Sequence, residues 1–68
     1  MAEIILNHVH QLRNQAGVTQ EQLAQAVGVC RQTIIAIEKG NYTPSVMLAL
    51  KISQFFKQPV EKIFSYDR

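Results

Sequence analysis

The chain has 68 residues, 47% hydrophobic and 18% charged, which suits one small folded domain and argues against a disordered segment. Its single cysteine excludes an internal disulfide, and its apolar runs are too short to cross a membrane, so the fold must rest on apolar packing. The formal net charge of +2 permits a nucleic-acid partner without requiring one.

The first predicted helix carries its apolar residues at helical spacing. Ile5, Val9, Leu12 and Ala16 follow one another at intervals that place them on a single helix face. Gly17 then offers the left-handed conformation that commonly ends a helix. Because no segment alternates with the period of a strand for long, we expect helices throughout.

The second predicted helix begins with a capping box. The Thr19 hydroxyl can accept a hydrogen bond from the amide three residues later, and Gln22 can reach back to the start. The helix continues to Val27 and ends at Gly28. Only Gly28 and Val29 separate this helix from the next one, so the two helices must cross steeply.

The third predicted helix runs from about Arg31 to Lys39, with Ile34 and Ile37 directed inward and Gly40 after its end. Cys30 occupies the N-cap position. A thiol is a weak acceptor there, so the cap is poorer than serine by about 1 kcal/mol. A second interpretation is a redox-sensitive thiol whose pKa is lowered by the helix N-terminus.

The fourth predicted helix has Thr43 as its N-cap and Pro44 at its first position. Its apolar stripe consists of Leu48, Ala49, Ile52, Phe55 and Phe56. Pro59 ends this helix, and Val60 to Phe64 form a short fifth one. We therefore predict an all-α fold, a compact five-helix domain that spans residues 1–68.

The histidines and the cysteine do not indicate an enzyme. His8 and His10 are two residues apart, so on a helix they point about 200° apart and cannot share a metal ion. Cys30 has no neighbouring histidine to activate it as a nucleophile. We therefore expect no catalytic residue, no metal, no other cofactor and no small-molecule substrate.

Two short helices joined by a glycine turn are typical of DNA-binding proteins that place the second helix in the major groove. On the third predicted helix, the face opposite the isoleucines carries Gln32, Ala36 and Lys39. Amide, methyl and ammonium groups are those that read base edges or hold phosphates. The alternative is a solvated helix face that only keeps the protein soluble.

The segment AGVTQEQLAQAVGVCRQTIIAIEKGNYTPS, followed by LALKISQFF, resembles the phage-repressor type of helix-turn-helix, also called the xenobiotic-response-element family. The likeness covers about residues 9 to 64. It implies a lambda-repressor-like fold with the helix-turn-helix at about residues 19–39. It also implies a cytoplasmic bacterial or phage transcriptional regulator, a repressor that binds double-stranded DNA at a pseudo-palindromic operator as a homodimer.

The resemblance also implies roles for individual residues. The base-reading positions correspond to Arg31, Gln32, Thr33 and Ala36. The positions near the DNA backbone correspond to Gln20, Cys30, Lys39, Asn41 and Tyr42. Arg13 and Glu38 match a structural ion pair of the family. Two roles stay open: Gln20 contacts a phosphate or packs on the reading residues, and Arg31 takes a base or a phosphate.

Two other functions remain open at this point. One is an antitoxin that regulates its own gene and binds a toxin. The other is a protein-interaction module that has lost DNA binding. Val46 and Met47, like Ile4 and Leu6, are apolar where exposure is expected, which indicates either an interface or scattered surface residues.

Overall fold

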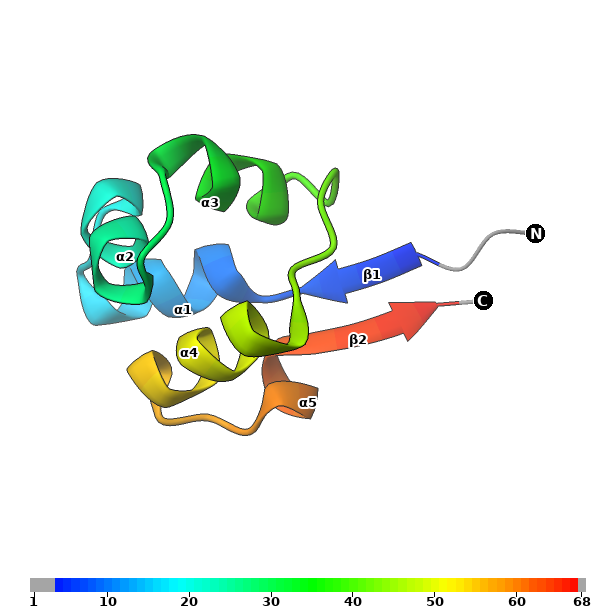
Figure 1. The fold of residues 1–68 in the computed structure, drawn as a ribbon. Helices are drawn as coiled ribbons and strands as arrows, with labels where there is room; N and C mark the ends of the chain where they lie inside the picture. The colour runs from blue at the N-terminus through cyan, green and yellow to red at the C-terminus, as the bar shows by residue number, and fades with distance from the viewer. Residues whose placement is uncertain (1–3, 68) are drawn as a thin grey trace.

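The computed structural model describes residues 4–67, which form five helices and a two-stranded antiparallel sheet (Figure 1). In chain order the elements are β1 (Ile4–Asn7), α1 (Val9–Ala16), α2 (Gln20–Val27), α3 (Arg31–Glu38), α4 (Val46–Phe56), α5 (Val60–Ile63) and β2 (Phe64–Asp67). Met1 to Glu3 and Arg68 lie outside the described residues. The five predicted helices are confirmed, whereas the sheet was not predicted.

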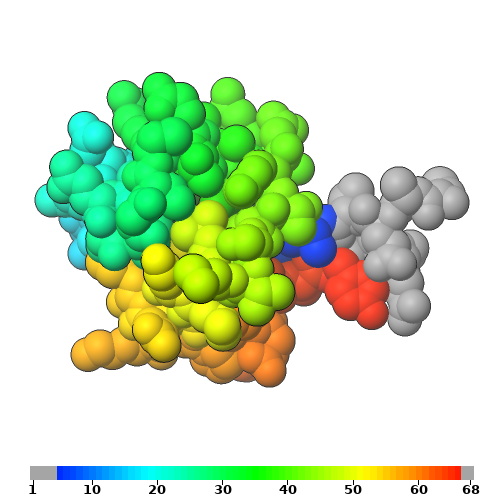
Figure 2. Space-filling model, in the orientation of Figure 1, coloured from blue at the N-terminus to red at the C-terminus, as the bar shows by residue number. Residues whose placement is uncertain are grey.

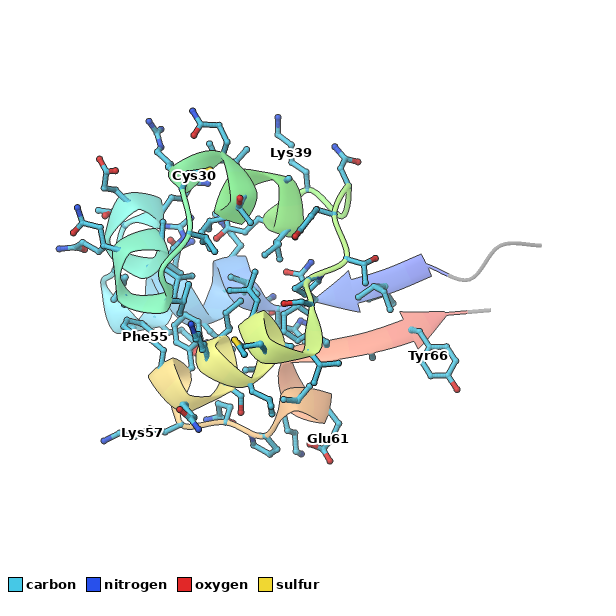
Figure 3. The ribbon with its side chains drawn as sticks, viewed as in Figure 1. Cys30, Lys39, Phe55, Lys57, Glu61 and Tyr66 are labelled. Carbon is cyan, nitrogen blue, oxygen red and sulfur yellow. The ribbon has the colours of Figure 1, made fainter. Side chains whose placement is uncertain are left out.

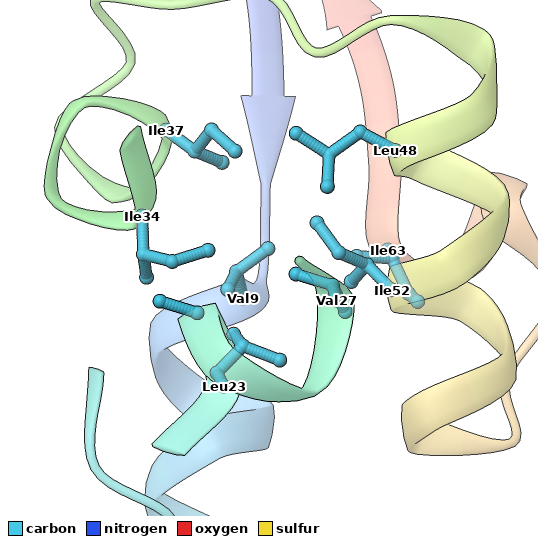
Figure 4. Packing of buried hydrophobic residues seen from close by; sticks show 9 residues of the cluster. Val9, Leu23, Val27, Ile34, Ile37, Leu48, Ile52 and Ile63 are labelled. Carbon is cyan, nitrogen blue, oxygen red and sulfur yellow. The ribbon is translucent and has the colours of Figure 1, made fainter. Parts of the chain in front are cut away.

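The hydrophobic core receives side chains from all five helices (Figure 4). Its buried members are Val9, Leu23, Ala24, Val27, Ile34, Ile37, Leu48, Ile52 and Ile63. All of them except Ile63 lie on α1 to α4, so the short helix α5 contributes one side chain that closes the core. Ala16 and Phe55, which were predicted to face inward, are instead exposed.

The prediction that Ile5 belongs to the first helix is wrong, because residues 4–7 form strand β1. Ile5 pairs with Tyr66 of β2, and Asn7 pairs with Phe64, which was expected to lie in the last helix. Asn7 separates strand from helix: its Oδ1 accepts a hydrogen bond from the amide of Val9 at 3.1 Å. This local bond competes with a continuous helix, so α1 begins only at Val9.

The helices α2 and α3 form as predicted. The capping box is present, with the amide of Gln22 donating to Thr19 Oγ1 at 3.0 Å and Gln22 Oε1 accepting from the amide of Thr19 at 2.9 Å. Gly28 ends α2 with φ +79°, a left-handed conformation that favours glycine. Cys30 follows as the N-cap of α3, so the turn that joins the two helices is short.

Helix α4 begins two residues later than predicted, because its N-cap is Ser45 and not Thr43. The Ser45 hydroxyl accepts a hydrogen bond from the amide of Leu48 at 3.1 Å. Pro44 then lies before the helix, where its fixed φ suits an extended loop. Both hydroxyl residues are acceptable caps by composition, and the placement of Leu48 in the core favours the later start.

Candidate nucleic-acid interface

Helix α3 turns one face to the core and the other to solvent. Ile34 and Ile37 are buried at 0% and 1% exposure, while Arg31 and Gln32 are exposed on the opposite side. Cys30 and Lys39 mark the two ends of this helix at the edge of the molecule, and Lys57 lies on the far side (Figure 3). The predicted base-reading residues therefore lie together on one outward surface, where Thr33 and Ala36 are half-buried.

The predicted backbone-contacting residues lie at both ends of this surface. At one end, Gln20 and Arg31 border a shallow hollow of about 650 Å³ beside the N-terminus of α2. At the other end, the loop of residues 39–45 carries exposed Lys39, Asn41 and Tyr42. The amide of Asn41 donates to the carbonyl of Ala36 at 2.9 Å, which keeps the start of this loop against α3.

Arg13 and Glu38 form an ion pair that joins α1 to the end of α3. Arg13 Nε donates to Glu38 Oε2 at 2.7 Å, and Arg13 Nη2 donates to Oε1 at 3.2 Å. The two side chains are only 11% and 7% exposed. A bidentate arginine–carboxylate pair of this kind fixes geometry as well as supplying attraction.

Two further side chains contact the Glu38 carboxylate, and the sequence did not predict either contact. Gln20 Nε2 donates to Glu38 Oε1 at 3.1 Å, and His10 Nδ1 lies 3.3 Å from the same oxygen. Arg13 also donates from Nη1 to the carbonyl of Val18 at 3.0 Å. The carboxylate thus connects α1, the start of α2 and the end of α3, and no local sequence signal points to this junction.

A helix-turn-helix family model matches residues 9–63, which is most of the chain. The chain belongs to the helix-turn-helix family of DNA-binding transcriptional regulators. It is 52% identical over 58 residues to the uncharacterized regulator YgzD of Bacillus subtilis, across 85% of this chain and 88% of that protein. It is 30% identical over 57 residues to RstR of Vibrio cholerae, a cryptic phage transcriptional repressor, across 84% of this chain and 51% of that one.

A solved structure supports the same assignment for this helix-turn-helix regulator. The restriction-modification controller protein C.AhdI of Aeromonas hydrophila superposes with a TM-score of 0.73 and 26% identity. The superposition covers 79% of this chain and 82% of that chain. The predicted family and the lambda-repressor-like fold are therefore confirmed.

In this regulator the contacts of Glu38 also set the charge state of its carboxyl group. Burial of Glu38 raises the pKa of its carboxyl, but hydrogen bonds from Arg13, Gln20 and His10 and the charge of Arg13 lower it further. The net pKa of Glu38 is lowered, so it is ionised and neutralised by Arg13. The pKa of Arg13 is raised by its hydrogen bond to Glu38, against an opposing effect of burial. The Glu38 side chain is 7% exposed and paired with Arg13, so it adds little negative charge to the outward face of α3.

The lowered pKa of Glu38 predicts a loss of stability in acid. Since the folded state lowers this pKa below its ordinary 4.5, the contribution is present above 4.5 and disappears as pH falls through the lower folded value. Urea unfolding should be measured at a series of pH values from neutral downward. The free energy of unfolding should fall less steeply with pH in Glu38→Gln than in wild type. The matched control is Glu61→Gln, an exposed carboxylate on α5 that should keep the wild-type slope. Identical slopes in wild type and Glu38→Gln would contradict the assignment.

Cys30 lies at the N-cap of α3, but its thiol caps no backbone amide. Sγ instead lies 3.4 Å from Thr33 Oγ1. The hydroxyl of Thr33 is the main cause of a lowered pKa of the exposed Cys30 thiol, with smaller effects from neighbouring amides. The helix therefore starts without the side-chain bond that Thr19 and Ser45 give to α2 and α4.

We expect Cys30→Ser to stabilise the protein by about 0.5–1 kcal/mol, because a serine hydroxyl is a better hydrogen-bond acceptor than a thiol for the backbone amides in the first turn of α3. Thr19→Ala, which removes an existing cap, should destabilise it by about 1 kcal/mol. Urea unfolding of the three proteins measures both changes. A Cys30→Ser protein no more stable than wild type would mean that the contact with Thr33 already supplies an equal benefit.

The described residues 4–67 contain neither a candidate metal cluster nor a candidate membrane span. No group of three or more histidine, cysteine, aspartate or glutamate side chains in that range could hold a metal ion. Within the same range, none of the helices combines the length and the apolar character that a membrane span needs.

Proposed function

We propose that this regulator is a repressor that binds a pseudo-palindromic operator as a homodimer, with α3 in the major groove of each half-site. The observation that carries the proposal is the outward face of α3, which exposes Arg31 and Gln32 while Glu38 points inward to Arg13. The similarity to RstR, itself a phage transcriptional repressor, favours repression. The site of action is the cytoplasm, where the operator DNA of a prokaryote lies.

Base reading follows from the chemistry of the outward face. In this proposal Gln32 pairs with the N6 and N7 groups of adenine, and Ala36 meets a thymine methyl. Thr33 offers a hydroxyl that donates or accepts. Arg31 can pair with the O6 and N7 groups of guanine, but it also borders the hollow beside α2, so a phosphate is its second possible partner.

The residues around α3 position the protein on the phosphates. Gln20 lies at the first position of α2, where backbone amides and the helix dipole favour an anion. Cys30 lies next to the first turn of α3, and the exposed Lys39, Asn41 and Tyr42 face the backbone beyond its other end. In this proposal Arg13 does not contact DNA, because its guanidinium group is paired with the carboxylate of Glu38.

Selection of binding sites from random duplexes by gel shift tests this function. We expect two related half-sites with centres about one helical turn, roughly 34 Å, apart. Affinity for the selected duplex should fall steeply as salt rises, because phosphate contacts release counterions. A promoter that carries the selected sequence should be silenced when the protein is present. Absence of duplex binding at low salt would refute the proposal.

Gln32→Ala should relax the preference at one base position in each half-site, because a bidentate contact gives about 1–3 kcal/mol of discrimination. The measurement is repeated site selection, with affinities for the four bases at each position. Gln58→Ala is the matched control, since Gln58 is exposed beside Lys57 on the far side of the molecule. An unchanged preference in Gln32→Ala would mean that α3 is placed differently in the groove.

A further inference from the structure

Helix α3 carries an isoleucine that the hydrophobic core does not use. Ile34 and Ile37 are the two side chains of this helix that are buried in the core. In the part of the chain that the structure describes, the half-buried apolar side chains that pack against this core are Leu12, Val18, Val29, Phe56 and Phe64. Ile35 is half-buried too, but it is not one of that set. Packing of the core therefore does not explain why residue 35 is apolar.

The helical period places Ile35 in the middle of the outward surface of α3. Residues four apart lie above one another on the same side of a helix, about 6 Å apart along its axis. Arg31, Ile35 and Lys39 therefore form one row, and Gln32 and Ala36 form the row beside it. In Figure 2 the green atoms of α3 lie at the upper edge of the molecule, where no other segment lies above them. An apolar side chain thus stands between two exposed cations on a surface that is open to a partner.

Helix formation does not explain Ile35 either. A β-branched side chain loses rotamer freedom in a helix, so isoleucine is a poorer helix former than alanine, glutamate or lysine. Single exposed apolar side chains are ordinary on protein surfaces. Ile35 differs from them in its place, because Arg31 and Lys39, the cations of its row, are both exposed toward the partner that α3 binds. A contact with that partner is the remaining physical reason for an isoleucine here.

We propose that Ile35 contacts the C5-methyl group of a pyrimidine in the major groove, so that operator affinity depends on this methyl group. The other groups that base edges present in this groove are hydrogen-bond donors and acceptors, which an isoleucine cannot satisfy. A methyl group is the apolar partner that the groove offers, and its burial against Ile35 removes apolar area from water. Thymine carries this group, and so does 5-methylcytosine. The inference rests on the proposed function, because it requires α3 to lie in the groove.

Replacement of single thymines by deoxyuridine tests the contact, because uracil lacks the methyl group but keeps every hydrogen-bonding group of thymine. The probe is a duplex that carries the operator obtained by site selection. Wild type should bind about 3–5-fold more weakly when one particular thymine of a half-site is replaced, as expected for the burial of one methyl group. Ile35→Ala should bind the thymine and uracil duplexes equally at that position. Each comparison is a ratio of two affinities of one protein, so effects of the substitution on folding or assembly cancel.

Leu50→Ala is the matched control, because it removes the same number of carbon atoms from a side chain of α4 that is 50% exposed. This variant should keep the full response to uracil. Ala36 contacts a different thymine methyl in the proposed function, so a second thymine should stay sensitive to uracil in Ile35→Ala. The two residues are thereby distinguished by the position at which the response is lost.

Duplexes with cytosine or 5-methylcytosine at the same position identify the source of the methyl group. In wild type 5-methylcytosine should bind more tightly than cytosine, and this difference should disappear in Ile35→Ala. If the thymine duplex binds more tightly than the 5-methylcytosine duplex, thymine is the natural target of Ile35. The opposite order would identify methylated cytosine as that target. Equal affinities for cytosine and 5-methylcytosine in wild type would count against the inference.

Failure of this inference is distinguishable from failure of the proposed function. If uracil has no effect at any thymine of the operator, the inference is overturned. It is also overturned if Ile35→Ala responds to uracil at every position as wild type does. In both cases wild type still binds its operator, so the proposed function stands. If wild type binds no duplex at low salt, the proposed function fails and this inference fails with it.

Discussion

Arg13→Ala should lower the free energy of unfolding by about 3–5 kcal/mol, because it leaves the carboxylate of Glu38 buried without its charged partner. Glu38 is 7% exposed, so water does not replace the lost guanidinium efficiently. The substitution also removes the hydrogen bond to the carbonyl of Val18. Urea unfolding followed by circular dichroism measures the change.

The neighbouring contact on the same carboxylate provides the control for this prediction. The His10 side chain is 61% exposed, so His10→Ala should cost less than about 1 kcal/mol. Arg13→Leu combined with Glu38→Leu should be less destabilised than either single variant, since no unpaired charge remains. Operator affinity per folded molecule should stay near that of wild type in Arg13→Ala. A large loss of that affinity with little loss of stability would make Arg13 a DNA ligand.

Ile34→Ala is the second change with a large expected effect. Ile34 is fully buried on the inner face of α3, against side chains of the other helices. Truncation of such an isoleucine costs about 2–5 kcal/mol through lost apolar burial and the cavity left behind. Small domains hold only about 5–15 kcal/mol in total, so a substantial fraction of the variant should be unfolded at 37 °C. Thermal unfolding and the fraction of protein competent to bind operator should fall together.

Ile35→Ala is the matched control, because it removes the same groups one residue further along the helix. Ile35 is half-buried beside the outward face. Its truncation should cost about 1 kcal/mol or less, as is usual for residues outside the core. Equal losses in Ile34→Ala and Ile35→Ala would contradict the orientation of α3.

The helix-turn-helix unit was predictable because its signals are local. The Thr19 capping box lies within four consecutive residues, and the stop at Gly28 needs only a residue that tolerates positive φ. Helical spacing placed Ile34 and Ile37 inward, and both are buried. Local hydrogen bonds and side-chain period act over one or two turns, so sequence alone carries them.

The sheet was not predictable in the same way. Residues 4–6 form a short apolar run, and such a run fits a helix or a strand equally well. Strand β1 forms because β2, Phe64–Asp67, lies alongside it, and Ile5 pairs with Tyr66. Asn7 was the missed local signal, since asparagine commonly marks the start of a helix.

The sequence by itself determined the five helices, the turn between α2 and α3, and membership of the helix-turn-helix family, since these depend on caps, glycines and helical period. Tertiary structure decided what depends on residues far apart in the chain. The N-cap of α4 is Ser45 and not Thr43. Gln20 and His10 contact Glu38, although they are far from it in the chain. Several residues could cap a helix or contact a carboxylate as far as the local sequence shows, and only the packing of the whole core decides which of them does so.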